Sequence, residues 1–125
     1  MAKKRILVVD DTTDIALPLK LYLEKAGAYE VQIETFGAKA LAAAKAFKPD
    51  LILLDVVMPD VDGGDVASQL EEDPETKTIP IVLLTASVTK QEVSERGGML
   101  GGRAILSKLT SMKEIVEYIK RQLGA

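Results

Sequence analysis

Short apolar runs alternate along this chain with segments of helical spacing, and no other feature limits the possible folds as strongly. Five runs have the length of strands, and they cover residues 5–10, 30–35, 50–55, 79–85 and 103–107. The first, third and fourth are apolar on both faces, as expected of central strands in a parallel sheet covered by helices. The second alternates, with Val31 and Ile33 on one face, so we expect an edge strand there.

The segments between these runs predict helices. The clear candidates cover residues 14–27, 38–47, 63–73 and 110–123. A weaker candidate lies between residues 85 and 103. In the first helix one face is apolar and includes Tyr22, Gly27 is a plausible C-cap, and we expect Pro18 near the first turn, where its missing N–H does least harm.

Strand and helix therefore alternate five times. Right-handed crossovers between parallel strands give an α/β fold, a doubly wound five-stranded parallel sheet with helices on both faces. The 125 residues fit one domain, residues 1–125, with a real hydrophobic core.

The composition removes several kinds of chemistry. The chain has no Cys and no His, which excludes thiolate or imidazole metal sites, cysteine nucleophiles and catalytic triads with histidine. A net charge of −3 argues against nucleic acid as the main partner, because phosphate contacts need clustered Lys and Arg. No apolar run approaches the length of a membrane span, so we expect no membrane partner and a cytoplasmic location. Any chemistry must rely on carboxylates and other oxygen ligands.

Polar residues follow the apolar runs where the predicted strands end. Asp10 and Asp11 end the first run, Asp55 the third and Thr85 the fourth, and Lys108 follows the fifth. Ligands of such sheets bind at the carboxyl ends of the strands, where strand order reverses. Taken singly, each residue is explained as well by a helix cap, a turn or a solvated side chain. As a set at one sheet edge, they predict a site.

Three carboxylates in one pocket repel one another unless a cation binds between them. Mg²⁺ takes hard oxygen ligands and keeps several waters, so two carboxylates and a carbonyl are an ordinary protein contribution. Lys108 would meet an anion, and Thr85 offers it a hydroxyl. This combination describes a phosphoryl-transfer site in which a carboxylate can be the nucleophile.

The same residues carry a resemblance to a known family. The motifs ILVVDD at 6–11, LILLDVVMPDVDG at 51–63 and VLLTA at 82–86, followed by Lys108, resemble the response regulator receiver domain of two-component signalling, of the chemotaxis-regulator type. The resemblance covers essentially the whole chain, and it implies the flavodoxin-like (βα)5 receiver fold.

The resemblance also implies a role for each site residue. Asp55 would be the phosphoacceptor. Asp11, Asp55 and the Val57 carbonyl would bind Mg²⁺ directly, and Asp10 would hold it through water. Lys108 and Thr85 would contact the phosphoryl oxygens, and the backbone N–H groups of Val57 and Ala86 would donate to them.

The partners follow from these roles. The phosphoryl donor would be a histidine kinase or phosphotransfer protein, and the output a protein target that the sequence does not identify. The chain would be a signalling receiver whose only catalysis is its own phosphorylation and the hydrolysis of its aspartyl phosphate.

Two departures from the family pattern keep an alternative open. Ile105 stands where the family commonly has Tyr or Phe, and Leu109 follows the lysine where the family usually has proline with a cis bond. A receiver-like protein-binding module that works without phosphorylation is therefore the second hypothesis. A phosphatase of the haloacid-dehalogenase type ranks third, because the Asp-x-Asp motif that it needs is missing at Asp10 and Asp11.

Two glycine-containing stretches imitate other motifs. DVDGGD at 60–65 resembles a calcium loop, but its sixth position is Asp65 where such a loop needs Gly, so we expect a loop and a helix start. GGMLGG at 97–102 lacks the lysine and spacing of a phosphate-binding loop. We expect it to end the fourth helix and enter the fifth strand.

Overall fold

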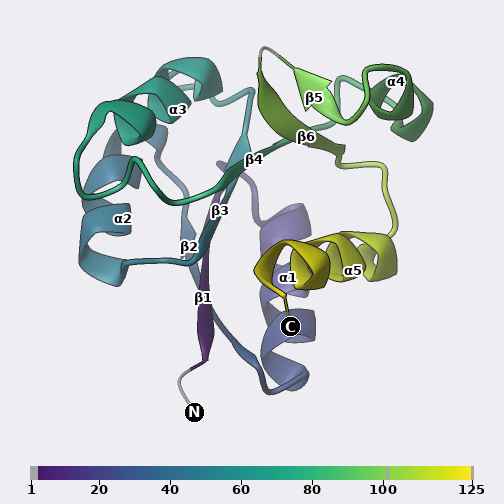
Figure 1. The fold of residues 1–125 in the computed structure, drawn as a ribbon, viewed down its shortest axis with the longest axis horizontal. Coiled ribbons are helices and arrows are strands. Elements are labelled where there is room, and N and C mark those ends of the chain that lie inside the picture. Colours follow the sequence, from purple (N-terminus) through teal and green to yellow (C-terminus); the bar gives the residue numbers. More distant parts are fainter. Residues whose placement is uncertain (1–2, 101, 125) are drawn as a thin grey trace.

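The computed structural model describes residues 3–100 and 102–124. Within them, six strands form one sheet in the order β2-β1-β3-β4-β6-β5. The strands are β1 (Lys4–Val9), β2 (Tyr29–Glu34), β3 (Leu51–Asp55), β4 (Ile81–Thr85), β5 (Met99–Leu100) and β6 (Arg103–Ser107). The five predicted strands are all present and pair in parallel, with β2 at the predicted edge (Figure 1).

The helices follow the predicted alternation. They are α1 (Thr13–Lys25), α2 (Ala40–Phe47) after a 3-10 turn at Gly37–Lys39, α3 (Gly63–Glu72), α4 (Lys90–Glu95) and α5 (Met112–Leu123). Asp62 caps α3 by accepting from Gly64 N, so the stretch 60–65 is a loop and helix start, as predicted. Among the described residues, no helix is both long and apolar enough to cross a membrane.

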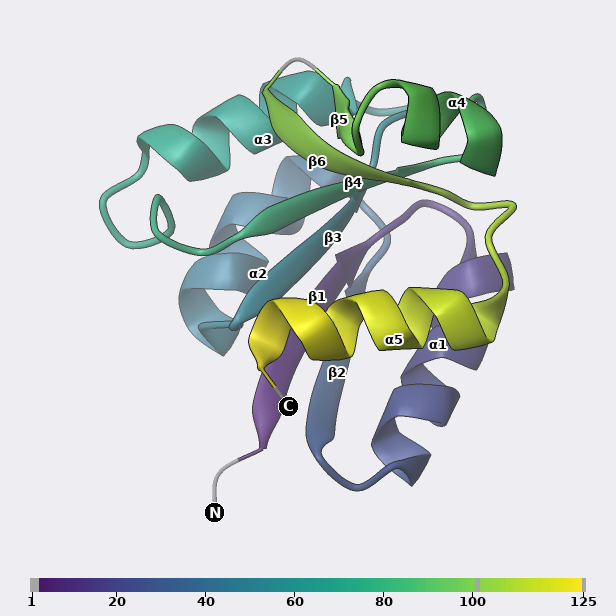
Figure 2. The ribbon, with the colours of Figure 1, turned by 45° about the vertical axis from the view of Figure 1, so that its right-hand side comes forward.

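Helices cover both faces of the sheet. The helices α1 and α5 cover one face, and α2 and α3 cover the other (Figure 2). The core beneath α1 and α5 includes Ile6, Leu53 and Ile119, and the core beneath α2 and α3 includes Leu7, Leu54 and Val66. Alternate residues of β1 and β3 thus enter opposite cores, which is why both runs are apolar throughout. The apolar face of α5 packs against the first of these cores, because Ile115, Val116 and Ile119 are buried and Leu123 is partly buried.

Two expectations for the first helix are wrong. Pro18 is the sixth residue of α1, which begins at Thr13, so it lies beyond the first turn. Its ring lies on the exposed side, where a lost backbone hydrogen bond is least costly. Tyr22 is 52% exposed, and the buried face is formed by Ala16, Leu19 and Leu23.

The region between Thr85 and Arg103 differs most from the prediction of a wholly parallel five-stranded sheet. The weak helix candidate is a six-residue helix with no buried residue. It ends before Gly97 and Gly98, which adopt φ of 65° and 75°. Met99 and Leu100 then form a sixth strand, antiparallel to β6. The predicted stretch 97–102 does end the helix, although its residue 101 lies outside the described residues.

Candidate functional site

The predicted site residues lie together at the carboxyl ends of neighbouring strands. Asp10 and Asp11 follow β1, Asp55 ends β3 and Thr85 ends β4. The backbone N–H of Lys108 donates to the Thr85 carbonyl (2.8 Å), which fixes the lysine one residue beyond β6. Parallel register carries all of these ends to one edge of the sheet.

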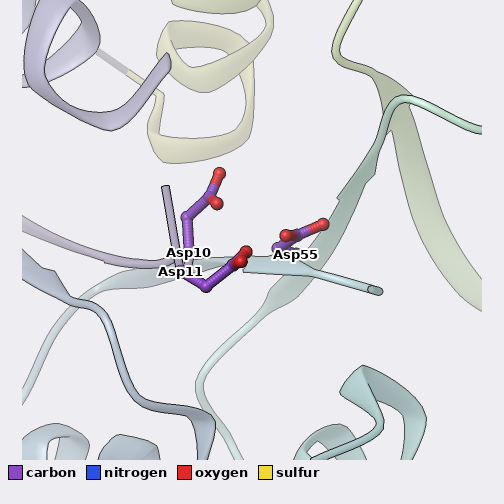
Figure 3. Close-up of side chains that lie close together, drawn as sticks. All are labelled: Asp10, Asp11 and Asp55. Carbon is purple, nitrogen blue, oxygen red and sulfur yellow. The ribbon is translucent and has the colours of Figure 1, made fainter. Parts of the chain in front are cut away.

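The three aspartates form an acidic cluster. One carboxylate oxygen from each of Asp10, Asp11 and Asp55 lies within 4.8 Å of the other two. Figure 3 shows the three side chains gathered at the ends of β1 and β3. Asp10 and Asp55 are buried, and Asp11 is half-buried.

The carboxylate oxygens of the cluster fit a hard cation as ligands. Asp10 Oδ1 accepts hydrogen bonds from the backbone N–H and the hydroxyl of Thr12. Asp10 Oδ2 is buried, and Lys108 Nζ lies 2.7 Å from it but not in the geometry of a hydrogen bond. Clustered carboxylate oxygens with unused lone pairs are the ligands that Mg²⁺ prefers, so the acidic pocket is compatible with magnesium binding.

Lys108 supplies the positive charge that faces the cluster. Its Nζ lies 2.7 Å from Asp10 Oδ2 and 3.3 Å from Asp55 Oδ2. Burial alone would lower the pKa of Lys108, but the two carboxylates outweigh burial and raise it. The ammonium is therefore charged at neutral pH.

Asp55 titrates unusually because of its surroundings. Burial and the negative charge of Asp10 raise the pKa of Asp55 to about 6, although Lys108 opposes the shift. A carboxylate in this setting is poorly solvated and repelled by its neighbours. A perturbed carboxylate with a specific cationic partner in an open pocket is a typical sign of a functional site.

The pocket above the cluster brings together most of the predicted residues. Its lining consists of Asp11, Thr12, Asp55, Val57, Thr85, Ala86, Ser87 and Lys108. The Thr85 hydroxyl lies 2.9 Å from the Ser87 hydroxyl and accepts the backbone N–H of Ser87. Ala86 is exposed at the rim. Asp10 lies buried beneath the pocket, and it contacts the lining residue Lys108 through their ion pair.

The loop after β3 keeps Asp55 at the floor of this pocket. The Val57 N–H donates to Asp55 Oδ1 (3.3 Å), and Val57 forms a bridge with Asp62. Val57 is 67% exposed, so its backbone, and not its side chain, makes the contact with Asp55. Gly63 N donates to the Val56 carbonyl, which closes the loop against α3.

Three hydroxyl residues of the site were not found by sequence reasoning. Thr12 orients Asp10, Ser87 bonds Thr85, and Ser107 is buried and donates to the Val88 carbonyl. Single hydroxyls have no periodic signature. The available signal was position, because each lies within two residues of a predicted site residue.

The two family departures are visible in the structure. The Lys108–Leu109 peptide bond is trans, as expected for a residue other than proline. Ile105 is 1% exposed and packs in the core beneath α2 and α3.

Comparisons with known proteins agree with these observations. Residues 6–120 match the model of the response regulator receiver domain. The chain is 36% identical over 123 residues to the polar-differentiation response regulator DivK of Brucella anthropi, with 97% of each chain covered.

Solved structures give the same family. The chemotaxis protein CheY4 of Vibrio cholerae is similar with a TM-score of 0.79 and 29% identity, over 96% of this chain and 98% of that one. A CheY-like receiver domain protein of Methanospirillum hungatei has a TM-score of 0.80 and 27% identity, over 98% of this chain and 95% of that one. The chain therefore belongs to the response regulator receiver domains, which are signalling proteins of two-component systems and not enzymes acting on a separate substrate.

Proposed function

We propose that this chain, as a single domain over residues 1–125, receives a phosphoryl group on Asp55 from a histidine kinase or phosphotransfer protein. One observation carries the proposal. The Asp55 carboxylate, 4% exposed, lies beside two further aspartates and has an oxygen 3.3 Å from the Lys108 ammonium. A buried nucleophile with cationic and acidic neighbours suits attack on a phosphoryl group.

Three aspartates would hold the magnesium ion. Asp11, Asp55 and the Val57 carbonyl would bind it directly, and Asp10 through water. When bound, magnesium would neutralise charge on the oxygens of the transferring phosphoryl group.

The side chains of this protein supply the remaining parts of the reaction. An Asp55 oxygen forms a bond to phosphorus as the bond from phosphorus to the donor imidazole nitrogen breaks. The imidazole keeps the electron pair and takes up a proton from solvent. Lys108 and Thr85 contact the phosphoryl oxygens, with the N–H groups of Val57 and Ala86 as further donors. Attack of water on phosphorus later releases inorganic phosphate and restores the Asp55 carboxylate.

The output surface is the region that follows Thr85. Residues 86–89 link Thr85 directly to α4, which contributes no buried residue to the core. A phosphoryl group that draws the Thr85 hydroxyl toward Asp55 would break its contact with Ser87 and move this loop. The moved loop and α4 would then present a different surface to a protein target.

Phosphorylation with a small acyl phosphate tests the proposal. The protein is incubated with acetyl phosphate and Mg²⁺, and the intact mass is measured. We expect a gain of one phosphoryl group that disappears with EDTA and in Asp55→Asn. Asp65→Asn, which changes an exposed aspartate of α3 outside the cluster, is the matched control and should be labelled normally.

The same experiment separates the alternatives. Labelling that survives Asp55→Asn would overturn the assignment of the phosphoacceptor. A wild-type protein that is never labelled, by acetyl phosphate or by a phosphohistidine protein, would favour the binding module that works without phosphorylation.

A further inference from the structure

We propose that Ser107 is a positioning residue that fixes the backbone on which Lys108 is mounted. The proposal rests on the proposed function, because Lys108 is the group that would meet the phosphoryl oxygens. Ser107 itself would not touch the phosphoryl group, and its hydroxyl would act through the two loops that it joins.

The Ser107 hydroxyl is buried and uses both of its hydrogen-bonding roles. The side chain is 1% exposed at the end of β6. Its Oγ donates to the Val88 carbonyl (2.6 Å) and accepts the backbone N–H of Leu109 (3.1 Å). One hydroxyl therefore ties the loop after β4 to the loop after β6.

These two bonds hold the peptide on the far side of Lys108. The near side is already held, because Lys108 N–H donates to the Thr85 carbonyl (2.8 Å) and Ser107 is the register partner of Thr85. With Leu109 N–H fixed as well, the Lys108 Cα is held from both directions. The flexible lysine stem then starts from a fixed point, and its ammonium meets Asp10 and Asp55 at 2.7 and 3.3 Å.

The identity of residue 109 makes the serine necessary. Leu109 is 67% exposed, so its side chain does not anchor this loop. A leucine leaves φ free, where a proline would restrict it, but it keeps a backbone N–H that proline lacks. The Ser107 hydroxyl uses that N–H, so a hydrogen bond supplies the restraint on the peptide after Lys108.

Chemical modification of lysines tests the proposal without relying on phosphorylation. The wild type, Ser107→Ala and Ser107→Thr are treated with limiting acetic anhydride, and acetylation of each lysine is measured by peptide mass analysis. We expect Lys108 to react about threefold faster or more in Ser107→Ala, because the hydrogen bonds that hold its backbone are lost. In Ser107→Thr we expect it to react at the wild-type rate. Lys45, an ion-paired lysine on α2, is the internal control and should not change.

Phosphorylation provides the second readout. At saturating Mg²⁺ we expect Asp55 labelling by acetyl phosphate to slow about tenfold in Ser107→Ala, because a catalytic group displaced by a fraction of an ångström loses efficiency, and to recover in Ser107→Thr. The Mg²⁺ concentration for half-maximal rate should not change, since the carboxylates are intact.

Each outcome decides a different claim. Equal Lys108 reactivity in the wild type and Ser107→Ala would overturn the positioning role, and so would a rise in Lys45 reactivity that matches the rise for Lys108, because that indicates general loosening. If the wild type is not labelled on Asp55, the proposed function fails, whereas the acetylation result still decides whether Ser107 holds Lys108.

Discussion

The ammonium nitrogen of Lys108 lies 2.7 Å from Asp10 Oδ2, and the two side chains are 12% and 1% exposed. This largely buried ion pair links the residues that follow β1 and β6, next to two further carboxylates. Removal of one partner from such a pair leaves an uncompensated buried charge, which costs far more than the loss of a surface ion pair.

Lys108→Met should therefore destabilise the metal-free protein strongly. Methionine keeps most of the apolar stem but removes the charge that faces Asp10. We expect the free energy of unfolding in urea with EDTA to fall by about 3 kcal/mol. The control is Lys45→Met, which removes an exposed lysine that pairs with Asp73 and Glu75, and the free energy of unfolding should change far less than in Lys108→Met.

Magnesium should return part of the stability that Lys108→Met loses, because a cation in the acidic cluster replaces the missing charge. Equal losses at the two lysines, or no recovery with Mg²⁺, would contradict this account of the site.

The stability of the metal-free protein should also depend on pH through Asp55. Its pKa is raised from the ordinary 3.8 to about 6. A carboxyl with a raised pKa in the folded state binds its proton more tightly there, so its contribution to stability is full below pH 3.8 and is lost as pH rises through about 6. Asp55→Asn removes this loss.

We accordingly expect Asp55→Asn to be more stable than the wild type at pH 8 and to lose that advantage at pH 4, in EDTA. Thermal melts of the two proteins at both pH values measure the difference. Asp65→Asn, the exposed control, should show no such change with pH. An advantage of Asp55→Asn that is the same at both pH values would mean that the shift is absent.

The sheet could be predicted from sequence because its central strands are buried on both faces. A short continuous apolar run such as 51–54 is typical of a strand that is covered on both faces. The strand β5 could not be predicted, because two residues carry no periodicity. The start of α1 was predicted to within one residue, at residue 14, and the helix begins at Thr13.

The candidate site was predictable as far as strand ends determine it. Parallel strands bring their carboxyl ends to one edge of the sheet, so Asp10, Asp55 and Thr85 were expected together at that edge. Which carboxylate Lys108 would approach more closely was not predictable, because that depends on loop geometry. The hydrogen bond from Ser107 to Val88 could not be predicted for the same reason, because it joins residues 19 positions apart through one hydroxyl.

The helix α4 is expected to be the least protected helix. It has six residues and none is buried, and Gly97 and Gly98 prevent its extension. Its main local restraint is a capping box between Thr89 and Glu92. Amide exchange from Val88 to Gly98 should be fast relative to α5, and Thr89→Ala should speed it further, since a lost cap costs about 1 kcal/mol. Similar protection in both helices would contradict this expectation.

Activation should not involve a side-chain rotation at residue 105. Ile105 is 1% exposed in the core, and its β-branched side chain is restricted at χ1. Addition of beryllofluoride, a phosphoryl mimic, with Mg²⁺ should therefore shift the amide resonances of residues 86–98 while the Ile105 methyl resonances move little. Large shifts of the Ile105 methyl resonances, with unchanged amide resonances for residues 86–98, would indicate that activation involves residue 105 instead.

The close approach between α3 and the Asp55 loop gives the last prediction. A Cβ on Gly63 would overlap the Asp55 carbonyl oxygen and the Val56 backbone, which cannot move without moving Asp55 itself. Overpacking of this kind typically costs about 1–3 kcal/mol, so Gly63→Ala should lower the free energy of unfolding by that amount. It should also slow Asp55 labelling by acetyl phosphate, because the Asp55 carboxylate shifts against Lys108 and Thr85.

Gly64→Ala is the matched control: its added Cβ would meet only the Asp62 Oδ1 side-chain atom, at 3.0 Å, and alanine favours the helix that begins there. We expect labelling in Gly64→Ala to remain near the wild-type rate. If both substitutions slow labelling equally, the effect arises from α3 as a whole, and the contact between Gly63 and the Asp55 backbone does not position the Asp55 carboxylate.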